Sequence, residues 1–232
     1  MTTSSHLAAR RTVVDAAATL VTNGVLSHTG HANLSARLGD DAMLLSVEGQ
    51  VRGLAVDGLA VVGFDGVVRE GELDPTNAEI AAMHAEVYRS RPEVGGIIHT
   101  HSPYLLAFAM AHRPLACRYE ALLRFGQASD VPVVPWAPRG SARSVSGIVD
   151  ALTTSSTNAV LLGNHGVLVV GAGPRQAAAL LTVLEEAAAG EIAALALGGA
   201  ADLPAGALSD VRAAMARVRG EDDGDGITSR PA

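Results

Sequence analysis

Two histidines separated by one residue, His99 and His101, are the residues of this sequence whose types and spacing most directly suggest chemistry. They follow the apolar pair Ile97-Ile98, which predicts a strand, and residues two apart in a strand project from the same face. A third histidine, His165, lies 64 positions after His101 in a Gly-flanked turn between two apolar runs. Three imidazoles with one vacant position are typical of a catalytic divalent-metal site, because a closed structural site would use a fourth protein ligand. The alternative interpretation is a pair of satisfied strand histidines and an unrelated turn histidine.

Glu79 is the acidic residue best placed to complete such a site. Asp74-Pro75-Thr76-Asn77 predicts the start of a helix, which puts Glu79 in its first turn, ahead of the histidine strand. A carboxylate there could be a fourth, displaceable ligand or a base that moves a substrate proton. It could equally be a glutamate that favours the helix macrodipole and contacts only water. Spacing alone leaves these roles open.

The hydrophobic pattern predicts the elements that must position these residues. Residues 5–23 predict an amphipathic helix that ends near Asn23-Gly24. Two hairpins follow, one over residues 30–47 whose loops would carry Asn33 and Arg37, and one around Asp65-Gly66. The rest predicts a helix from Asp74 that Arg91-Pro92 ends, the histidine strand, helices over residues 102–111, 140–152 and 174–197, a Pro-broken edge segment over residues 131–136, and a strand-turn-strand around His165.

The overall composition limits the class of protein. The formal net charge is −7, with 17 Lys and Arg against 24 Asp and Glu, and no basic cluster marks a nucleic-acid surface. The single cysteine, Cys117, excludes an internal disulfide, and the first 25 residues lack the pattern of a signal peptide. No apolar run predicts a transmembrane span. We therefore expect a cytoplasmic α/β protein without nucleic-acid or membrane partners, with one domain over residues 1–218 and an acidic, disordered tail over residues 219–232.

Several short motifs occur in one characteristic order along the chain. They are Asn33-Leu34-Ser35-Ala36-Arg37, Glu79 ahead of Met83-His84-Ala85-Glu86-Val87-Tyr88, Arg91-Pro92-Glu93-Val94, His99-Thr100-His101-Ser102 and Asn164-His165-Gly166. In these motifs the sequence resembles the class II aldolase/adducin family over about residues 5–198, and is similar to fuculose-phosphate aldolase and ribulose-phosphate 4-epimerase. The resemblance implies a single three-layer α/β/α domain with a central, largely antiparallel sheet. It also implies a homotetramer with active sites at subunit interfaces.

The same resemblance implies roles for individual residues. His99, His101 and His165 would bind Zn²⁺, or another divalent cation such as Mn²⁺, Co²⁺ or Mg²⁺. Glu79 would be the fourth ligand, which becomes the acid/base when substrate binds. Tyr119 lies near the place of a tyrosine acid that a neighbouring subunit contributes in family aldolases, although an ungapped count from His101 puts Glu120 there instead. The alternative role for Tyr119 is a packed aromatic at an interface.

Metal-dependent cleavage of a carbon–carbon bond is the function that the resemblance implies. A substrate hydroxyl and carbonyl would chelate the cation, whose charge stabilises the enediolate formed when the bond breaks, while Glu79 moves a proton. We therefore expect a lyase of aldolase type that acts on a small hydroxy-carbonyl substrate. The alternative is non-oxidative decarboxylation of a hydroxylated carboxylic acid, for example an aromatic, dihydroxyphthalate-like one. A non-catalytic adducin-like scaffold is a third hypothesis, which the intact histidine triad and Glu79 disfavour.

The segments that would bind phosphate differ from those of phosphosugar members of the family. Those members use Gly-Asn before the Ser-x-Arg motif, Thr-Gly after the first strand and Ser-Ser before the catalytic Glu, where this sequence has Ala32-Asn33, Glu48-Gly49 and Asn77-Ala78. A carboxylate at Glu48 and two missing hydroxyls would repel a phosphate dianion or leave it unpaired. The substrate is thus predicted not to be a standard sugar phosphate. Asn33 and Gly49 remain to hold an anion or a polar group, and Glu48 and Asn77 complete the candidate substrate-binding set.

Further polar residues accompany these motifs. His28 and His31 are candidates for substrate contact, with exposed or structural roles as the favoured alternative. The segment 136–141 could present Arg139 to a substrate carboxylate. Arg139 belongs to a set of arginines concentrated in the segment after the histidine strand. The favoured alternative for this set, Arg118, Arg124, Arg139 and Arg143, is a solvated or subunit-bridging role.

Overall fold

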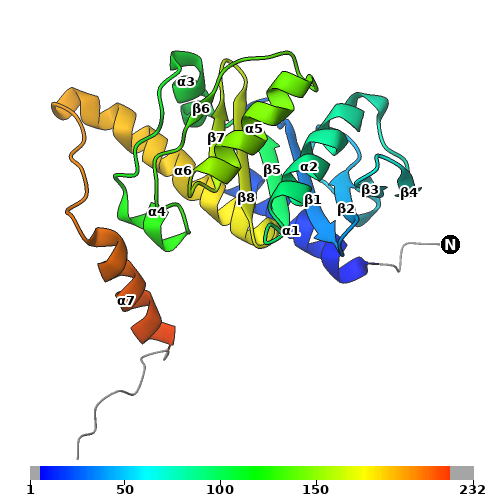
Figure 1. Ribbon diagram of the computed structural model, residues 1–232, viewed down its shortest axis with the longest axis horizontal. Coiled ribbons are helices and arrows are strands. Elements are labelled where there is room, and N and C mark those ends of the chain that lie inside the picture. The colour runs from blue at the N-terminus through cyan, green and yellow to red at the C-terminus, as the bar shows by residue number, and fades with distance from the viewer. Residues whose placement is uncertain (1–5, 220–232) are drawn as a thin grey trace, which may run out of the picture.

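The computed structural model describes residues 6–219 and has an eight-stranded sheet at the centre of that part of the chain (Figure 1). The strand order is β4-β3-β2-β1-β5-β8-β7-β6, and every neighbouring pair is antiparallel except β6 and β7. The predicted largely antiparallel sheet is confirmed. Its strands are β1 (Ala32–Leu38), β2 (Ala42–Ser46), β3 (Leu59–Gly63), β4 (Val68–Glu70), β5 (Gly96–Thr100), β6 (Val133–Val134), β7 (Ala159–Leu162) and β8 (Gly166–Gly171).

Helices cover both faces of the sheet and complete the three predicted layers (Figure 1). The side chains of neighbouring strand residues alternate between two cores, so that Ile98 packs against α1, α3 and α6 while Ile97 packs against α2 and α5. The helices are α1 (Leu7–Thr22), α2 (Ala78–Ser90), α3 (Pro103–Ala111), α4 (Glu120–Arg124), α5 (Ala142–Thr154), α6 (Pro174–Ala194) and α7 (Ala207–Arg219), with short 3₁₀ turns at Val56–Gly58, Pro75–Asn77 and Leu195–Leu197.

The segment that carries Asn33 and Arg37 is a strand, and the prediction that these residues lie in hairpin loops is wrong. Both residues lie on β1, which pairs with β2 on one side and β5 on the other. The polar side chains of this central strand are accommodated because they find partners: Ser35 contacts Tyr88, and Arg37 donates to the carbonyls of Tyr88 and Val94. The local pattern of polar residues therefore hid a buried strand.

Two helices were not expected from the sequence. They are α4 and α7, which contact each other. In Figure 1, α7 lies away from the sheet, beyond a connecting segment that leaves the end of α6. Val211 of α7 is buried, whereas the other residues of this helix whose burial is described, up to Val218, are exposed or half-buried. Most of the predicted acidic tail, residues 220–232, lies outside the described residues.

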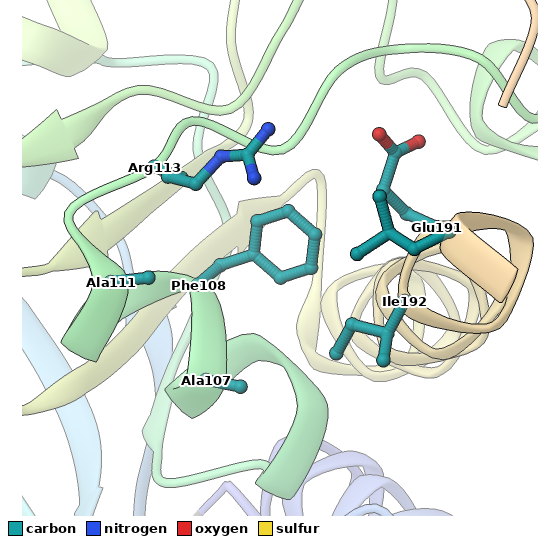
Figure 2. A pocket seen from close by; sticks show the side chains of 7 residues that line it. Ala107, Phe108, Ala111, Arg113, Glu191 and Ile192 are labelled. Carbon is teal, nitrogen blue, oxygen red and sulfur yellow. The ribbon is translucent and has the colours of Figure 1, made fainter. Parts of the chain in front are cut away.

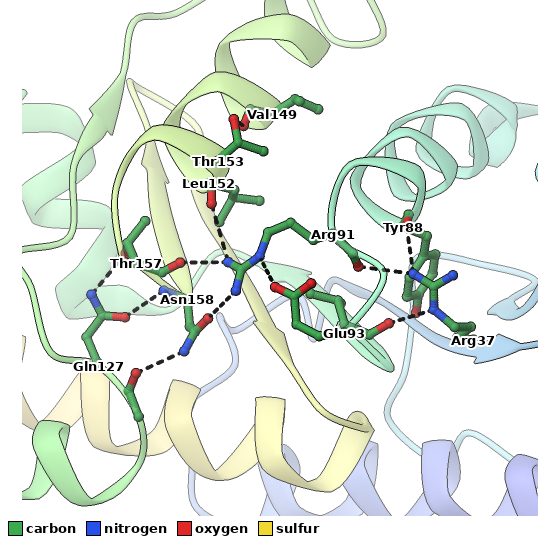
Figure 3. A network of polar contacts seen from close by, with 12 residues as sticks. Arg37, Tyr88, Arg91, Glu93, Gln127, Val149, Leu152, Thr153, Thr157 and Asn158 are labelled. Atoms are coloured by element: carbon green, nitrogen blue, oxygen red, sulfur yellow. Dashed lines mark hydrogen bonds and ion pairs between the residues drawn. The ribbon is translucent and has the colours of Figure 1, made fainter. Parts of the chain in front are cut away.

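Arg91, at the end of α2, joins three segments of the chain through its guanidinium group (Figure 3). Nη1 donates to the carbonyl of Thr157 at 2.8 Å and to that of Leu152 at 3.4 Å, and Nη2 donates to Oδ1 of Asn158 at 3.1 Å. Nε pairs with Glu93 at 2.6 Å. The guanidinium thus ties the end of α2 to the end of α5 and to the loop before β7.

Replacing Arg91 with methionine should lower the free energy of unfolding by about 2–3 kcal/mol, since it leaves several acceptors without their donor. The urea midpoint of the purified variant measures this loss. Arg175→Met is the matched control, because Arg175 pairs with Asp15 on the surface, with both side chains more than half exposed. That control should change stability by less than about 0.5 kcal/mol. Equal losses in the two variants would contradict the importance of the Arg91 contacts.

Among the helices of residues 6–219, none is long and apolar enough to cross a membrane.

Candidate metal and active site

The three predicted metal-binding histidines meet at one end of the sheet. His99 is the fourth residue of β5, His101 follows that strand directly, and His165 lies in the turn between β7 and β8. Because β8 pairs with β5, this turn lies beside His101. The ring centroids are 5.3 Å apart for His99 and His101, 4.8 Å for His99 and His165, and 5.1 Å for His101 and His165. The three rings are thus mutual neighbours at this end of the sheet.

The backbone of the turn that carries His165 depends on the residues on either side of it, Asn164 and Gly166. Asn164 adopts a left-handed conformation with φ of 55°, and its Oδ1 accepts a hydrogen bond of 2.5 Å from Nε2 of His112. A Cβ at Gly166 would lie 2.7 Å from Cδ2 of His101 and would overlap the carbonyl oxygen of Thr100. Glycine at position 166 therefore lets the turn come close to His101, and His112 is a positioning residue for it.

The histidines are held in the uncharged state that metal ions require. Nδ1 of His99 donates to the carbonyl of Val167 at 3.0 Å, which leaves Nε2 with a free lone pair. Burial, strengthened by the neighbouring His165 and His101, holds the pKa of His99 well below its usual range. Burial and the nearby His165 and His31 lower the pKa of His101 to about 4. Burial and the Arg139 charge also lower the pKa of His165.

These features fit a divalent cation with nitrogen ligands. Nε2 of His101 is buried and has no hydrogen-bond partner among the described residues, which is the state expected of a ligand atom that faces a metal position. A hydrogen bond from the far nitrogen of a ligand to a carbonyl, such as that of His99, is the usual second contact of a metal-binding histidine. The donor set therefore suits the cation that the sequence predicts.

Glu79 lies in the first turn of α2, and Arg139 reaches it from the loop before α5. Nε of Arg139 pairs with Oε2 of Glu79 at 3.0 Å, and Nη2 donates to the carbonyl of Thr76. The contact between Arg139 and Glu79 depends on Gly140, which has a φ of 72°. A Cβ at this residue would lie 2.7 Å from both Cγ and Cδ of Glu79. Arg139 also lowers the pKa of His31 and of His165, so its charge reaches the histidine cluster. Glu79 is thus paired with an arginine whose charge acts on two of the histidines.

A fourth histidine, His31, belongs to the same cluster. Its ring stacks on that of His101, with centroids 4.9 Å apart and planes at 15°, and lies 6.4 Å from the ring of His99. One ligand atom from each of His31, His99 and His101 lies within 4.8 Å of the others. Burial and the Arg139 charge lower the pKa of His31. The nearby His28 is exposed instead.

Two of the predicted substrate-binding residues form a buried amide pair. Nδ2 of Asn33 donates to Oδ1 of Asn77 at 3.4 Å, and Nδ2 of Asn77 donates to the carbonyl of Val47 at 3.0 Å. Asn33 pairs with His99 in the sheet, so the two side chains share a face. Oδ1 of Asn33 is buried and has no partner among the described residues. An acceptor therefore remains open close to His99.

The remaining predicted site residues differ in how they lie relative to the histidines. Gly49 lies against the His31 ring, while Glu48 is exposed on a hollow formed by the segment between β2 and β3. Tyr119 is 44% exposed at the start of α4 and lines a hollow with Arg118 and Glu191, so it does not join the histidines within this chain. Arg118 pairs with Glu191 and Asp202, and Arg124 pairs with Glu120. These two arginines follow the predicted surface role, whereas Arg139 lies at the site.

An apolar hollow of about 200 Å³ lies between α3 and the end of α6 (Figure 2). Phe108 and Ile192 face each other across it, and Arg113 and Glu191 lie at its rim. Its lining among the described residues includes none of the candidate site residues. The apolar hollow is therefore separate from the candidate metal and active site.

Comparison with known proteins gives the relatives of this chain. A family model described as the class II aldolase and adducin N-terminal domain matches residues 11–192. The chain is 34% identical over 195 residues to the 3-oxo-tetronate 4-phosphate decarboxylase of Pectobacterium atrosepticum, which covers 80% of this chain and 84% of that protein. It is 27% identical over 184 residues to the 5-methylthioribulose-1-phosphate/5-deoxyribulose-1-phosphate aldolase of Rhodospirillum rubrum, with 79% and 80% covered.

Solved structures agree with these relatives. YgbL of Klebsiella pneumoniae has a TM-score of 0.73 and 30% identity, over 91% of this chain and 100% of that one. An L-fuculose 1-phosphate aldolase has a TM-score of 0.77 over 90% and 96% of the two chains, at 22% identity, which is a likeness of fold. The prediction of a lyase agrees with relatives named as aldolases and decarboxylases. Since the family model covers most of its length, this protein belongs to the class II aldolase and adducin family.

Proposed function

We propose that this protein is a divalent-metal-dependent carbon–carbon lyase that acts on a small hydroxy-carbonyl substrate. The observation that carries the proposal is the cluster of three imidazoles, from His99, His101 and His165, whose pKa values are all lowered. Glu79 is linked to this cluster through Arg139, which pairs with Glu79 and whose charge acts on His165. Imidazole nitrogen suits Zn²⁺ or Co²⁺ better than Mg²⁺, which prefers oxygen ligands. The relatives support the reaction class, since they bear the names of aldolases and decarboxylases.

Each side chain of the site would have a different role in such a reaction. A bound cation would supply the positive charge that stabilises the electron pair left when a carbon–carbon bond breaks. The three histidines would hold the cation, and Glu79 would take or return a proton of the substrate. Arg139 orients the Glu79 carboxylate through the pair at 3.0 Å. Oδ1 of Asn33 would accept a hydrogen bond from a substrate hydroxyl.

Decarboxylation of a hydroxylated carboxylic acid is the second candidate, and Arg139 favours it. A guanidinium beside the histidines is suited to bind a carboxylate, which is the group that a decarboxylase removes. The relative from Pectobacterium atrosepticum, at 34% identity, is named as a decarboxylase. Aldol cleavage and decarboxylation would share the cation and Glu79, and they differ in the fragment released.

A substrate panel with separate product assays tests the proposal and separates the two reactions. Metal-loaded protein is incubated with hydroxy-carbonyl compounds, hydroxy and keto acids, dihydroxy-aromatic acids, and phosphorylated ketoses. Aldehyde and carbon dioxide are then measured independently. Metal-dependent release of either product supports the proposed lyase. No release of either product across the panel would contradict it, and efficient cleavage of phosphorylated ketoses would contradict the predicted exclusion of sugar phosphates.

Replacing Arg139 with glutamine should raise KM for an acidic substrate by about tenfold, because one charge-assisted hydrogen bond is lost. The KM for an uncharged hydroxy-carbonyl compound should change much less. Arg143→Gln is the matched control, since Arg143 is exposed on α5. Steady-state kinetics of both variants measure the difference. An equal rise in KM for charged and uncharged substrates would show that Arg139 acts on Glu79 alone.

We also propose a homotetramer with active sites at subunit interfaces. Large apolar side chains are exposed on several elements near the site, including Met110 on α3 and Trp136 in the loop that leads to Arg139. Tyr119 would then come to the site from a neighbouring subunit, as the sequence implies, because it lies apart from the histidines within one chain. Light scattering after size-exclusion chromatography measures the assembly, and a monomer at working concentrations would contradict it.

A further inference from the structure

We propose that His31 is a specificity-determining residue that makes the site select short hydroxy acids over their phosphorylated counterparts. The inference rests on the proposed function, because it assigns the substrate class of the same site. The relatives reported above that are named for phosphorylated substrates do not decide this point, since the choice of substrate depends on the residues lining the site as well as on the metal ligands.

The position of His31 is fixed by contacts on several sides. Its carbonyl accepts a hydrogen bond of 2.7 Å from Oγ1 of Thr100, and its ring stacks on His101. The ring also lies directly against the backbone of Gly49, where a Cβ would overlap Cε1 and lie 2.6 Å from Nδ1. The imidazole of His31 therefore fills the space between the metal-ligand candidate His101 and Gly49.

This arrangement leaves few hydrogen-bond donors for a phosphate group near Gly49. A phosphate dianion is bound by several N–H donors or by positive charge. The His31 ring occupies the space into which a side chain at residue 49 would point, the Nδ2 donor of Asn33 is used by Asn77, and the residue before Gly49 is the acidic Glu48. The group left without a partner is Oδ1 of Asn33, a buried acceptor that suits a hydroxyl and repels an anion.

Arg139 supplies positive charge that suits an anion. Its guanidinium lies against Glu79 and its charge acts on both His31 and His165, so a carboxylate can bind next to Arg139 while the neighbouring hydroxyl faces the histidines. His31 limits how far the rest of the molecule extends toward Gly49. The substrate class that fits is a short hydroxy acid that ends without a phosphate.

Two matched probes, glycerate and 3-phosphoglycerate, test this inference, since they share the hydroxy acid and differ by a phosphate. Calorimetric titration of the full-length, zinc-loaded protein measures both dissociation constants. The wild type should bind glycerate at least about tenfold more tightly. His31→Ala should shift the ratio of the two constants toward 3-phosphoglycerate by about tenfold or more, and His31→Asn should shift it in the same direction. His28→Ala, on the exposed neighbour, should keep the wild-type ratio.

The zinc content of each variant distinguishes a failure of the His31 role from a failure of the proposed metal-dependent function. A wild type that holds zinc and prefers 3-phosphoglycerate, or folded His31 variants with an unchanged ratio, would overturn the role of His31 and leave the proposed function intact. A wild type that holds zinc but binds neither probe would overturn the hydroxy-acid substrate class and leave the proposed lyase intact. If the wild type holds no zinc after loading, the proposed function fails and this inference fails with it.

Discussion

Replacing His165 with alanine should remove bound metal and turnover together. The ring of His165 lies 4.8 Å from that of His99 and 5.1 Å from that of His101, so its loss leaves two imidazoles to hold the ion. Loss of a contact that merely orients a ligand already costs about 10- to 100-fold in metal affinity, and loss of the ligand itself should cost more. Elemental analysis of the purified variant, and competition with a chelator of known affinity, measure the effect.

His165 is the histidine best suited to this test, because His99 is buried within the sheet and its replacement also disturbs packing. The far-ultraviolet circular dichroism and the urea midpoint of His165→Ala should resemble those of the wild type in metal-free buffer. His112→Ala is the matched control from outside the triad, since it removes only the hydrogen bond to Asn164. It should weaken metal binding less than His165→Ala does. Full metal content in a folded His165→Ala would contradict the triad.

The histidine pair could be predicted from the sequence because its geometry is local. A strand places residues two apart on one face whatever the rest of the fold does, and Ile97-Ile98 identified the strand. The meeting of that pair with His165 is not local. It depends on the pairing of β5 with β8, which no spacing in the sequence specifies. The order of the motifs, through the family resemblance, supplied that information.

The place of His31 shows where the prediction from sequence failed. The hairpin predicted over residues 30–47 is present as β1 and β2, but the short, polar-alternating segment predicts loops at Asn33 and Arg37, where the structure has the strand β1 itself. With residues 32–38 assigned to a strand, His31 and Asn33 fall on one face by the same period of two that joins His99 to His101. The pairing of Ala32 with Thr100 then puts His31 opposite His101. The partners that bury these polar groups, such as Asn77 and Tyr88, come from other segments and could not be predicted from the sequence.

The sequence predicts where Glu79 and Arg139 each lie along the chain, but it does not predict that they contact each other. The sequence placed Glu79 in the first turn of a helix and Arg139 in a loop, and favoured a surface role for the arginines. The two residues are 60 positions apart, and the contact depends on how the loop before α5 folds over the start of α2. Tertiary packing decides such a contact, so local propensity gave no information about it.

Replacing Glu79 with glutamine should leave metal content unchanged and lower kcat by about 10²- to 10⁴-fold, the usual contribution of a general acid or base. Glutamine has nearly the same shape but cannot take up a proton near neutral pH. The exposed side chain of Glu79, 51% accessible, makes few packing contacts, so the variant should fold normally. Metal analysis and single-turnover kinetics separate loss of the ion from loss of proton transfer. Unchanged turnover would show that another group moves the proton.

A second variant tests whether the position of the Glu79 carboxylate matters as well as its chemistry. In Gly140→Ala, a methyl group would lie 2.7 Å from Cγ and Cδ of Glu79, at a residue with φ of 72° that disfavours alanine. The carboxylate would keep its charge but lose its place beside Arg139. We expect kcat to fall while metal content is retained, because none of the three imidazoles is changed. If Glu79→Gln is inactive and Gly140→Ala is fully active, the carboxylate works from more than one position, and its pair with Arg139 serves stability rather than proton transfer.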